Sequence, residues 1–278
     1  MTVPTRPAGS AEIRVAAAAM GTRFEIVLLG ENRGYLRAAG EAALARVEEA
    51  HQAFSRFDQA SLLAHLRRSA PRPVVVDRET LAMFENLACV ARQSDRTFDP
   101  YYLSPAGMTE WPIIDRHHST VAFPTSACDP DLGGCAKGFA VDWAVTVLRG
   151  AGVEQAFVQG GTSSMFGLGS PSGSPGWRVA LGPQADDPVI ALLNQGLACS
   201  ASMTMREGQR IPHLFDRGTG RVLMNDHRAV VVGPSAGPAD AWATAAAVTG
   251  TRPRLLEGQW NCWIRKGAQP WQVPMMTE

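Results

Sequence analysis

The chain has 278 residues, of which 45% are hydrophobic and 19% are charged, and its formal net charge is +0. This length accommodates one large or two smaller domains with a substantial apolar core. The balanced charge, without a basic stripe, argues against nucleic acid or an anionic membrane as the main partner. No apolar run is long enough to span a bilayer, so membrane insertion is not expected.

The cysteine pattern and the N-terminal sequence bear on the compartment. The five cysteines are scattered, odd in number and without a CxxC pair, so they signal neither a disulfide framework nor a zinc site. The apolar stretch from Val15 to Met20 is too short for the core of a signal peptide. A cytoplasmic location, in a reducing environment, is therefore expected.

The first third of the chain combines strand and helix patterns. Residues 1–11 read as a flexible tail, whereas residues 22–29 favour a strand because they are rich in strand formers and bounded by glycines. Apolar residues at helical spacing predict helices over 33–54 and 78–92. A short helix at 62–66 and a short strand at 74–76 are expected between them.

The rest of the chain is expected to be richer in strands. A helix should follow the glycine-rich turn near residue 131 and end near 149, and a second helix should contain residue 240. Strands are predicted around 113–114 and at 155–159, 164–168, 177–181, 189–193, 197–200 and 228–232, followed by a terminal hairpin with Trp260, Trp263 and Trp271. Successive strands of this kind suggest an antiparallel sheet.

The segment 131–142, DLGGCAKGFAVD, is the most informative stretch. A glycine-rich turn leads directly into an apolar helix, and glycines let the backbone approach a ligand closely. Amides of a first helical turn lack intrahelical partners and can bind an anion, and Lys137 adds a positive charge near Asp131. A phosphate or pyrophosphate fits, although the spacing matches neither the Walker loop nor the dinucleotide fingerprint. The alternative is a helix that begins with glycine and aspartate merely as caps.

A second motif pairs Asp240 with Thr244. Residues four apart share a face of a helix, so a carboxylate and a hydroxyl can supply two oxygen ligands on that face. Mg²⁺ prefers such ligands and often bridges protein to phosphate. The alternative is an aspartate favoured by the helix dipole, with the threonine bonding back to a carbonyl.

A histidine in the segment 213–216 (HLFD) is a further candidate. Alternation along a strand would place His213 and Phe215 on one face, and a histidine facing a cleft can act as a general base near neutral pH. The alternative is a structural histidine that only forms hydrogen bonds. Three other histidines match no motif and are expected at the surface: His117, His118 and His227.

Together these segments resemble the ApbE-like flavin transferases, the FAD:protein FMN transferase family. The resemblance extends along most of the chain, in order. It comprises Met20-Gly21-Thr22, Phe54-Ser55-Arg56-Phe57-Asp58 with Ser61, Thr97-Phe98-Asp99-Pro100, the turn from Asp131 to Asp142, Gln159-Gly160-Gly161, His213-Leu214-Phe215-Asp216 with Thr219-Gly220, and the pair Asp240 and Thr244.

The resemblance implies an α+β fold, related to the T-fold, with mixed or antiparallel sheets and flanking helices. One two-lobed domain would span residues 12–278 and bind FAD in a cleft between the lobes. Mg²⁺ would hold the FAD pyrophosphate through the side chains of Asp240 and Thr244 and the carbonyl of Gly134. The residues implied to contact FAD are Met20, Phe57, Thr97, Phe98, Asp99, Asp131, Lys137 and Leu214.

The implied reaction is attack on the FMN-side phosphorus of FAD. AMP would leave, and FMN would be carried onto a threonine or serine hydroxyl of an unidentified flavin-acceptor protein. His213 is the preferred base and Asp216 the second candidate. Two alternatives stay open: an FAD pyrophosphatase that releases FMN and AMP, and an FAD-binding protein without turnover.

Three departures from the family pattern bear on these alternatives. Relatives usually read Thr-Ser-Gly-Asp where this chain has Cys199-Ser200-Ala201-Ser202, so only Ser200 matches. A proline of the family is replaced by Arg217. The segment between Pro100 and Asp131 is also shorter than usual. The first two departures favour flavin binding without turnover, and the third could reshape the flavin pocket.

Overall fold

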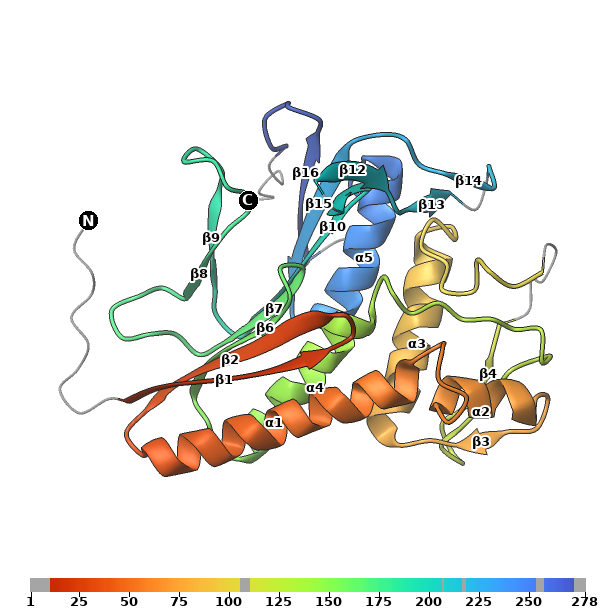
Figure 1. Ribbon diagram of the computed structural model, residues 1–278, viewed down its shortest axis with the longest axis horizontal. Helices are drawn as coiled ribbons and strands as arrows, with labels where there is room; N and C mark the ends of the chain where they lie inside the picture. The colour runs from red at the N-terminus through yellow and green to blue at the C-terminus, as the bar shows by residue number, and fades with distance from the viewer. Residues whose placement is uncertain (1–10, 106–110, 207, 217–218, 254–257, 273–278) are drawn as a thin grey trace.

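The computed structural model describes residues 11–105, 111–206, 208–216, 219–253 and 258–272 (Figure 1). The expected flexible tail therefore lies outside the described residues, apart from Ala11, which begins the first strand. Arg217, one of the departures from the family pattern, also lies outside them. Among the described residues, no helix combines the length and the apolarity that crossing a bilayer requires.

A seven-stranded sheet forms the centre of the molecule, in the order β1-β2-β6-β7-β10-β15-β16. All its neighbouring strands pair antiparallel, as the sequence suggests. The strands are β1 (Ala11–Ala19), β2 (Thr22–Gly30), β6 (Gln155–Gly160), β7 (Ser164–Leu168), β10 (Gln195–Ala201), β15 (His227–Gly233) and β16 (Asn261–Lys266). The expected terminal hairpin is present, because Gln272 returns to pair with Ile264 of β16.

In the described part of the chain, five helices accompany the sheet, and each lies where its sequence pattern predicts it. They are α1 (Arg33–Phe54), α2 (Leu62–Ser69), α3 (Arg78–Gln93), α4 (Ala136–Gly150) and α5 (Ala236–Thr249). Each of the first three is preceded by a polar residue whose side chain accepts a backbone N–H of the first turn; these residues are Asn32, Ser61 and Asp77. Such caps satisfy amides that lack an intrahelical partner, which explains why these helices start where they do.

The residues that the structure describes also form four smaller sheets around the centre. β3 (Val74–Val75), β5 (Thr120–Ala122) and β4 (Ile113–Asp115) form one of them, beside α2 and α3. The others are hairpins: β8 (Trp177–Ala180) with β9 (Val189–Leu192), β11 (Met203–Arg206) with β12 (Gln209–Pro212), and β13 (Phe215–Asp216) with β14 (Arg221–Val222). This mixture of helices and antiparallel sheets confirms the predicted α+β class.

The two faces of the central sheet are covered differently (Figure 1). Helices α1, α4 and α5 pack on one face, where alternate residues of β2, Phe24, Ile26 and Leu28, are fully buried. On the other face, the β8–β9 hairpin covers a second cluster that includes Leu192, Leu197 and Val230. Because the side chains of a strand alternate between faces, the neighbours Val230 and Val231 belong to different cores.

Two features of the fold differ from what the sequence suggested. The strand β1 was not predicted, because its alanine-rich end carries little strand preference; it forms by pairing along its whole length with β2. His227 was expected at the surface, but it begins β15 and is half-buried, with its Nδ1 atom 3.3 Å from the carbonyl oxygen of Ala247.

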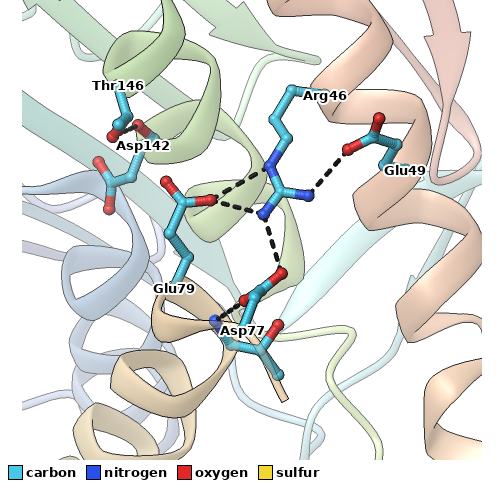
Figure 2. A network of polar contacts seen from close by, with 7 residues as sticks. Arg46, Glu49, Asp77, Glu79, Asp142 and Thr146 are labelled. Carbon is cyan, nitrogen blue, oxygen red and sulfur yellow. Dashed lines mark hydrogen bonds and ion pairs between the residues drawn. The ribbon is translucent and has the colours of Figure 1, made fainter. Parts of the chain in front are cut away.

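A charged cluster fastens α1 to the start of α3 (Figure 2). The guanidinium of Arg46 donates to Glu79 and to Asp77, and its third nitrogen donates to Glu49 one turn along α1. The same guanidinium lies 4.3 Å from the ring centroid of Trp143 on α4, within the range of a cation–π contact. The cluster therefore brings α1, α3 and α4 together at one point.

Asp142 on α4 anchors the start of α5. Its two carboxylate oxygens accept the backbone N–H groups of Ala236 and Gly237 at 2.7 and 2.8 Å. Burial raises the pKa of Asp142 to about 7, and the two backbone hydrogen bonds act in the opposite direction. Because the first amides of a helix lack intrahelical partners, this carboxylate determines where α5 begins relative to α4.

We expect Asp142→Ala to lower the free energy of unfolding by about 1–3 kcal/mol, because it leaves two buried backbone donors without acceptors. Urea denaturation followed by circular dichroism measures this loss. Thr146→Ala is the matched control, since the Thr146 hydroxyl bonds only to the main-chain carbonyl of Asp142, at the exposed side of the same helix (Figure 2). Equal stabilities of the two variants would contradict the anchoring role.

Candidate functional site

A cavity of about 470 Å³ opens where the start of α4, the middle of α5 and the connections that follow β10 and β12 meet. Most of the residues that the sequence singled out come together in its walls: Thr97, Phe98, Asp99, Asp131, Gly134, Lys137, His213, Leu214, Asp240 and Thr244. These residues come from four separate stretches of the chain. The cavity is therefore the candidate functional site.

The carboxylate of Asp240 is the most buried charged group of the cavity, with 3% of the residue exposed. Its Oδ2 atom accepts the N–H of Gly138 at 3.1 Å and the hydroxyl of Ser164 at 3.0 Å. Among the described residues, the other carboxylate oxygen has no hydrogen-bonding partner. Burial raises the pKa of Asp240, while the charge of Lys137 acts in the opposite direction. Asp240 thus has one oxygen committed to the fold and one available for a ligand.

Thr244 brings a second oxygen to the same wall. Its hydroxyl lies 3.2 Å from the carbonyl oxygen of Gly134 and 3.1 Å from that of Asp240. The alternative interpretation, in which the Thr244 hydroxyl donates to a carbonyl of its own helix, is therefore correct for the contact with Asp240, and the contact with Gly134 exists beside it. A Cβ at Gly134 would stand 3.1 Å from the Thr244 hydroxyl, so glycine permits this close approach. Two of the three predicted oxygen ligands, the Thr244 hydroxyl and the Gly134 carbonyl, are thus in contact, and Asp240 lines the same cavity.

The turn before α4 is held by Asp131. Its Oδ1 atom accepts the N–H of Gly133 at 2.9 Å, and its Oδ2 atom accepts the Tyr102 hydroxyl at 3.0 Å. Arg56 reaches the same Oδ2 atom at 3.4 Å. Asp131 is therefore a structural hub of the turn as well as part of the cavity wall.

The anion cradle expected from the first amides of α4 is only partly available. The N–H of Ala136 donates to the carbonyl of Leu132, and the N–H of Gly138 donates to Asp240. Positive charge comes from Lys137, whose exposed ammonium donates to the carbonyl of Gly133 at 3.3 Å. An anion in the cavity would accordingly be met by the lysine side chain more than by the helix amides.

His213 lies in the cavity wall, although not on a strand as expected. The residues His213 and Leu214 connect β12 to β13, and the backbone N–H of His213 donates to the carbonyl of Ser202. Alternation therefore does not separate them, and both line the cavity together with Phe215. His213 is exposed as a residue, and partial desolvation of its imidazole together with the nearby charge of Lys137 lowers its pKa from the ordinary value, which favours the neutral form at neutral pH.

Three predicted site residues do not line this cavity. Met20 sits in the turn between β1 and β2, with a positive φ of 50° and its N–H directed to His51. Phe57 is 86% exposed. Asp216 accepts the hydroxyl of Thr219 within the β13–β14 hairpin. Of the two candidate bases, only His213 therefore lies in the cavity wall.

Sequence reasoning missed several residues of the site. Tyr102 places an aromatic ring in the cavity wall, beside Phe215, which the segment 213–216 had already set on the face of His213, and Ser164 orients Asp240 from β7. Tyr102 follows closely on the segment 97–100, and this proximity was the available signal. Ser164 had no local signal, because its partner is far away in the sequence.

The segment 199–202, which departs from the family pattern, lies partly in the cavity wall and partly in the core. Cys199, Ser200 and Ala201 line the cavity, whereas Ser202 is fully buried. The Ser202 hydroxyl donates to the carbonyl of Asn225 at 2.7 Å and accepts the N–H of His227 at 2.9 Å. This side chain therefore holds the start of β15 and supplies no carboxylate to the site.

Solved structures with the same fold are found at low sequence identity. The chain is similar to an ApbE protein from Thermotoga maritima, with a TM-score of 0.77, 20% identity and coverage of 95% of this chain and 97% of that one. It is also similar to the flavin transferase ApbE from Vibrio cholerae, with a TM-score of 0.76, 18% identity and coverage of 95% and 96%. For the flavinyl transferase ApbE from Pseudomonas stutzeri, the TM-score is 0.72, the identity 18% and the coverage 95% of both chains.

Comparison at the level of sequence agrees with these structural likenesses. No curated protein sequence matches the chain significantly. A model of the ApbE family, however, matches residues 20–105 and 102–261, which include every segment of the cavity described above. The match covers well over half of the chain, and the chain therefore belongs to the ApbE family.

Proposed function

We propose that this protein transfers FMN from FAD to a serine or threonine hydroxyl of an acceptor protein, with Mg²⁺ bound and AMP released. One observation carries the proposal: the oxygen donors of Asp240, Thr244 and Gly134 lie together in a cavity that also contains a lysine and a neutral histidine. Family membership, and structural likeness to two proteins named as flavin transferases, support it.

The donor set suits Mg²⁺. This ion prefers six oxygen ligands at about 2.0–2.1 Å in an octahedron, which sets adjacent ligands about 3 Å apart. The Thr244 hydroxyl and the Gly134 carbonyl, 3.2 Å apart, are close to that spacing. Mg²⁺ sites often combine one or two carboxylates with substrate phosphates, and Asp240 would supply the carboxylate. A bound ion would neutralise charge that develops on the pyrophosphate during transfer.

Lys137 would bind the remaining phosphate charge. Its ammonium is exposed at the cavity and contacts only a neutral carbonyl among the described residues, so it can turn toward a ligand without breaking an ion pair. The same charge also acts on Asp240 and His213, in each case against the protonated form. The lysine therefore favours the ionised carboxylate and the neutral imidazole that the reaction needs.

His213 would act as the general base. The oxygen of the acceptor hydroxyl attacks the FMN-side phosphorus, and the bond from that phosphorus to the oxygen of AMP breaks. The hydroxyl proton passes to an imidazole nitrogen of His213, and AMP leaves with the electron pair of the broken bond. A histidine with a lowered pKa is neutral at neutral pH, so it can accept this proton without first losing one.

One observation keeps a second candidate function open. The family aspartate expected at position 202 is a buried serine here, so this segment adds no charge to the cavity. A protein that binds FAD without cleaving it is therefore the alternative. Incubation with FAD and Mg²⁺ separates the possibilities: AMP release that increases with an acceptor protein supports the transferase, FMN and AMP from FAD alone a pyrophosphatase, and intact bound FAD the binder.

We expect Asp240→Asn to reduce Mg²⁺-dependent AMP release from FAD by about 100-fold or more, because the variant loses the one carboxylate of the proposed metal site. Chromatography of the nucleotides, with and without EDTA, measures the effect, and circular dichroism checks the fold.

The matched control for this loss is Thr249→Ala, which removes a hydroxyl at the end of the same helix that contacts only backbone carbonyls and its neighbour Thr251. This control should retain the activity of the wild type. Full activity of Asp240→Asn would place the metal elsewhere.

For His213, we expect kcat/KM to stay level down to about pH 6.5, the ordinary pKa of histidine, and to fall only at lower pH, because the pKa of this base is lowered. A pH–rate profile of AMP release tests this. His213→Gln should be about 100-fold slower or more and should lose the acidic limb. A variant that keeps both the rate and the limb would remove His213 from the mechanism.

A further inference from the structure

Two aromatic side chains from distant parts of the chain meet in the cavity wall. Tyr102 belongs to the turn after the segment 97–100, and Phe215 belongs to β13. Their ring centroids are 5.3 Å apart and their planes are inclined by 33°. Neither residue is fully buried, and both line the cavity, so the pair presents aromatic surface to whatever the cavity holds.

A hydrogen bond to the turn before α4 fixes the position of Tyr102. Its hydroxyl donates to Oδ2 of Asp131 at 3.0 Å, and the same carboxylate accepts the N–H of Gly133. Burial, together with the neighbouring Asp131 carboxylate, raises the pKa of Tyr102 to about 12, so the hydroxyl remains a donor at neutral pH. The ring is thus attached to the turn that also carries the Gly134 carbonyl.

The position of Phe215 is fixed from the opposite side. Its backbone pairs with Val222 in the β13–β14 hairpin, and it follows His213 by two residues. Figure 1 shows this hairpin projecting from the central sheet toward the part of the chain that contains α3. The aromatic pair therefore joins the segment of the proposed base to the segment of the proposed phosphate site.

The pair differs in character from much of the remaining wall. Asp131, Lys137 and Asp240 are charged, and several other lining residues carry hydroxyl groups: Thr97, Thr162, Ser163, Ser200, Thr204 and Thr244. A flat aromatic ligand ring gains about 1–3 kcal/mol by stacking on a protein aromatic side chain. Among the described residues of this wall, Tyr102 and Phe215 are the two aromatic side chains whose rings contact each other.

We infer that Tyr102 and Phe215 form the stacking surface for the flavin ring of the substrate. This inference rests on the proposed function, which supplies the flavin. The flavin is favoured over the adenine because the proposed base, His213, must lie beside the FMN-side phosphorus, and Phe215 is on the same short segment. Tyr102 would contribute its ring, and its hydrogen bond to Asp131 would hold that ring in place.

The test compares the binding of FMN, followed by quenching of its fluorescence, with the binding of AMP, followed by calorimetry. Phe215→Leu and Tyr102→Leu should each raise the Kd for FMN about tenfold and leave the Kd for AMP within about twofold, because one aromatic face is lost. Tyr102→Phe keeps the ring and should stay within about threefold of the wild type for FMN.

Two neighbouring variants serve as matched controls. Leu103→Ala and Val222→Ala shorten partly exposed side chains beside each ring that do not line the cavity, so both should bind FMN as the wild type does. Unchanged FMN binding by the two leucine variants would overturn the inference. Loss of AMP affinity in place of FMN affinity would assign the pair to adenine and overturn the flavin assignment.

Failure of this inference can be told apart from failure of the proposed function. A wild type that releases AMP from FAD with Mg²⁺, while its leucine variants bind FMN normally, contradicts only the stacking surface. A wild type that binds FMN through these rings but never releases AMP, with any acceptor tested, contradicts only the transferase.

Discussion

The buried carboxylate of Asp240 is the group on which the site depends. A carboxylate removed from water is costly unless it is hydrogen-bonded, and this one is bonded to the N–H of Gly138 on α4 and to the hydroxyl of Ser164 on β7. The contact between Thr244 and Gly134 lies on the same junction. A displacement of α4 against α5 would therefore disturb the proposed metal ligands and the buried charge together.

Close packing sets the separation of α4 and α5 at this junction. A Cβ at Gly138 would stand 2.3 Å from the carbonyl oxygen of Ala236, so only glycine lets the two helices approach this far. Asp142 adds a bidentate contact to the first amides of α5. Small residues along α5 allow it to be buried on nearly all sides, between the sheet, α3 and α4. In this part of the molecule, the contacts that pack the core therefore also set the positions of the site residues.

The turn before α4 is secured to the neighbouring part of the molecule by charge. Asp131 binds Arg56, which also pairs with Asp129, and Asp129 pairs in turn with Arg67 on α2. These groups are partly exposed, so each pair is worth little alone, and their value lies in connecting the turn to α2 through several contacts. Ser202 secures the start of β15 without charge, because its hydroxyl bonds to the carbonyl of Asn225 and to the N–H of His227.

Local patterns in the sequence were sufficient to predict much of the fold. The helices α1 and α3 follow from apolar spacing, and the structure adds the caps at Asn32 and Asp77; β2 follows from its strand formers between glycines. The motifs around Asp131 and Asp240 could be recognised because their residues are close together in the chain. In each of these cases the deciding interaction is local, which is why a single sequence contains it.

Only the tertiary structure decided what depends on distant partners. The strand β1 exists because β2 pairs with it, and His213 lies outside a strand because its neighbours pair elsewhere. Phe57 is exposed and Met20 lies outside the cavity wall, although the motifs that contain them suggested a ligand contact. The contact between Tyr102 and Phe215 joins segments with no local relation. Packing between remote elements places these side chains, and periodicity along one segment carries no information about it.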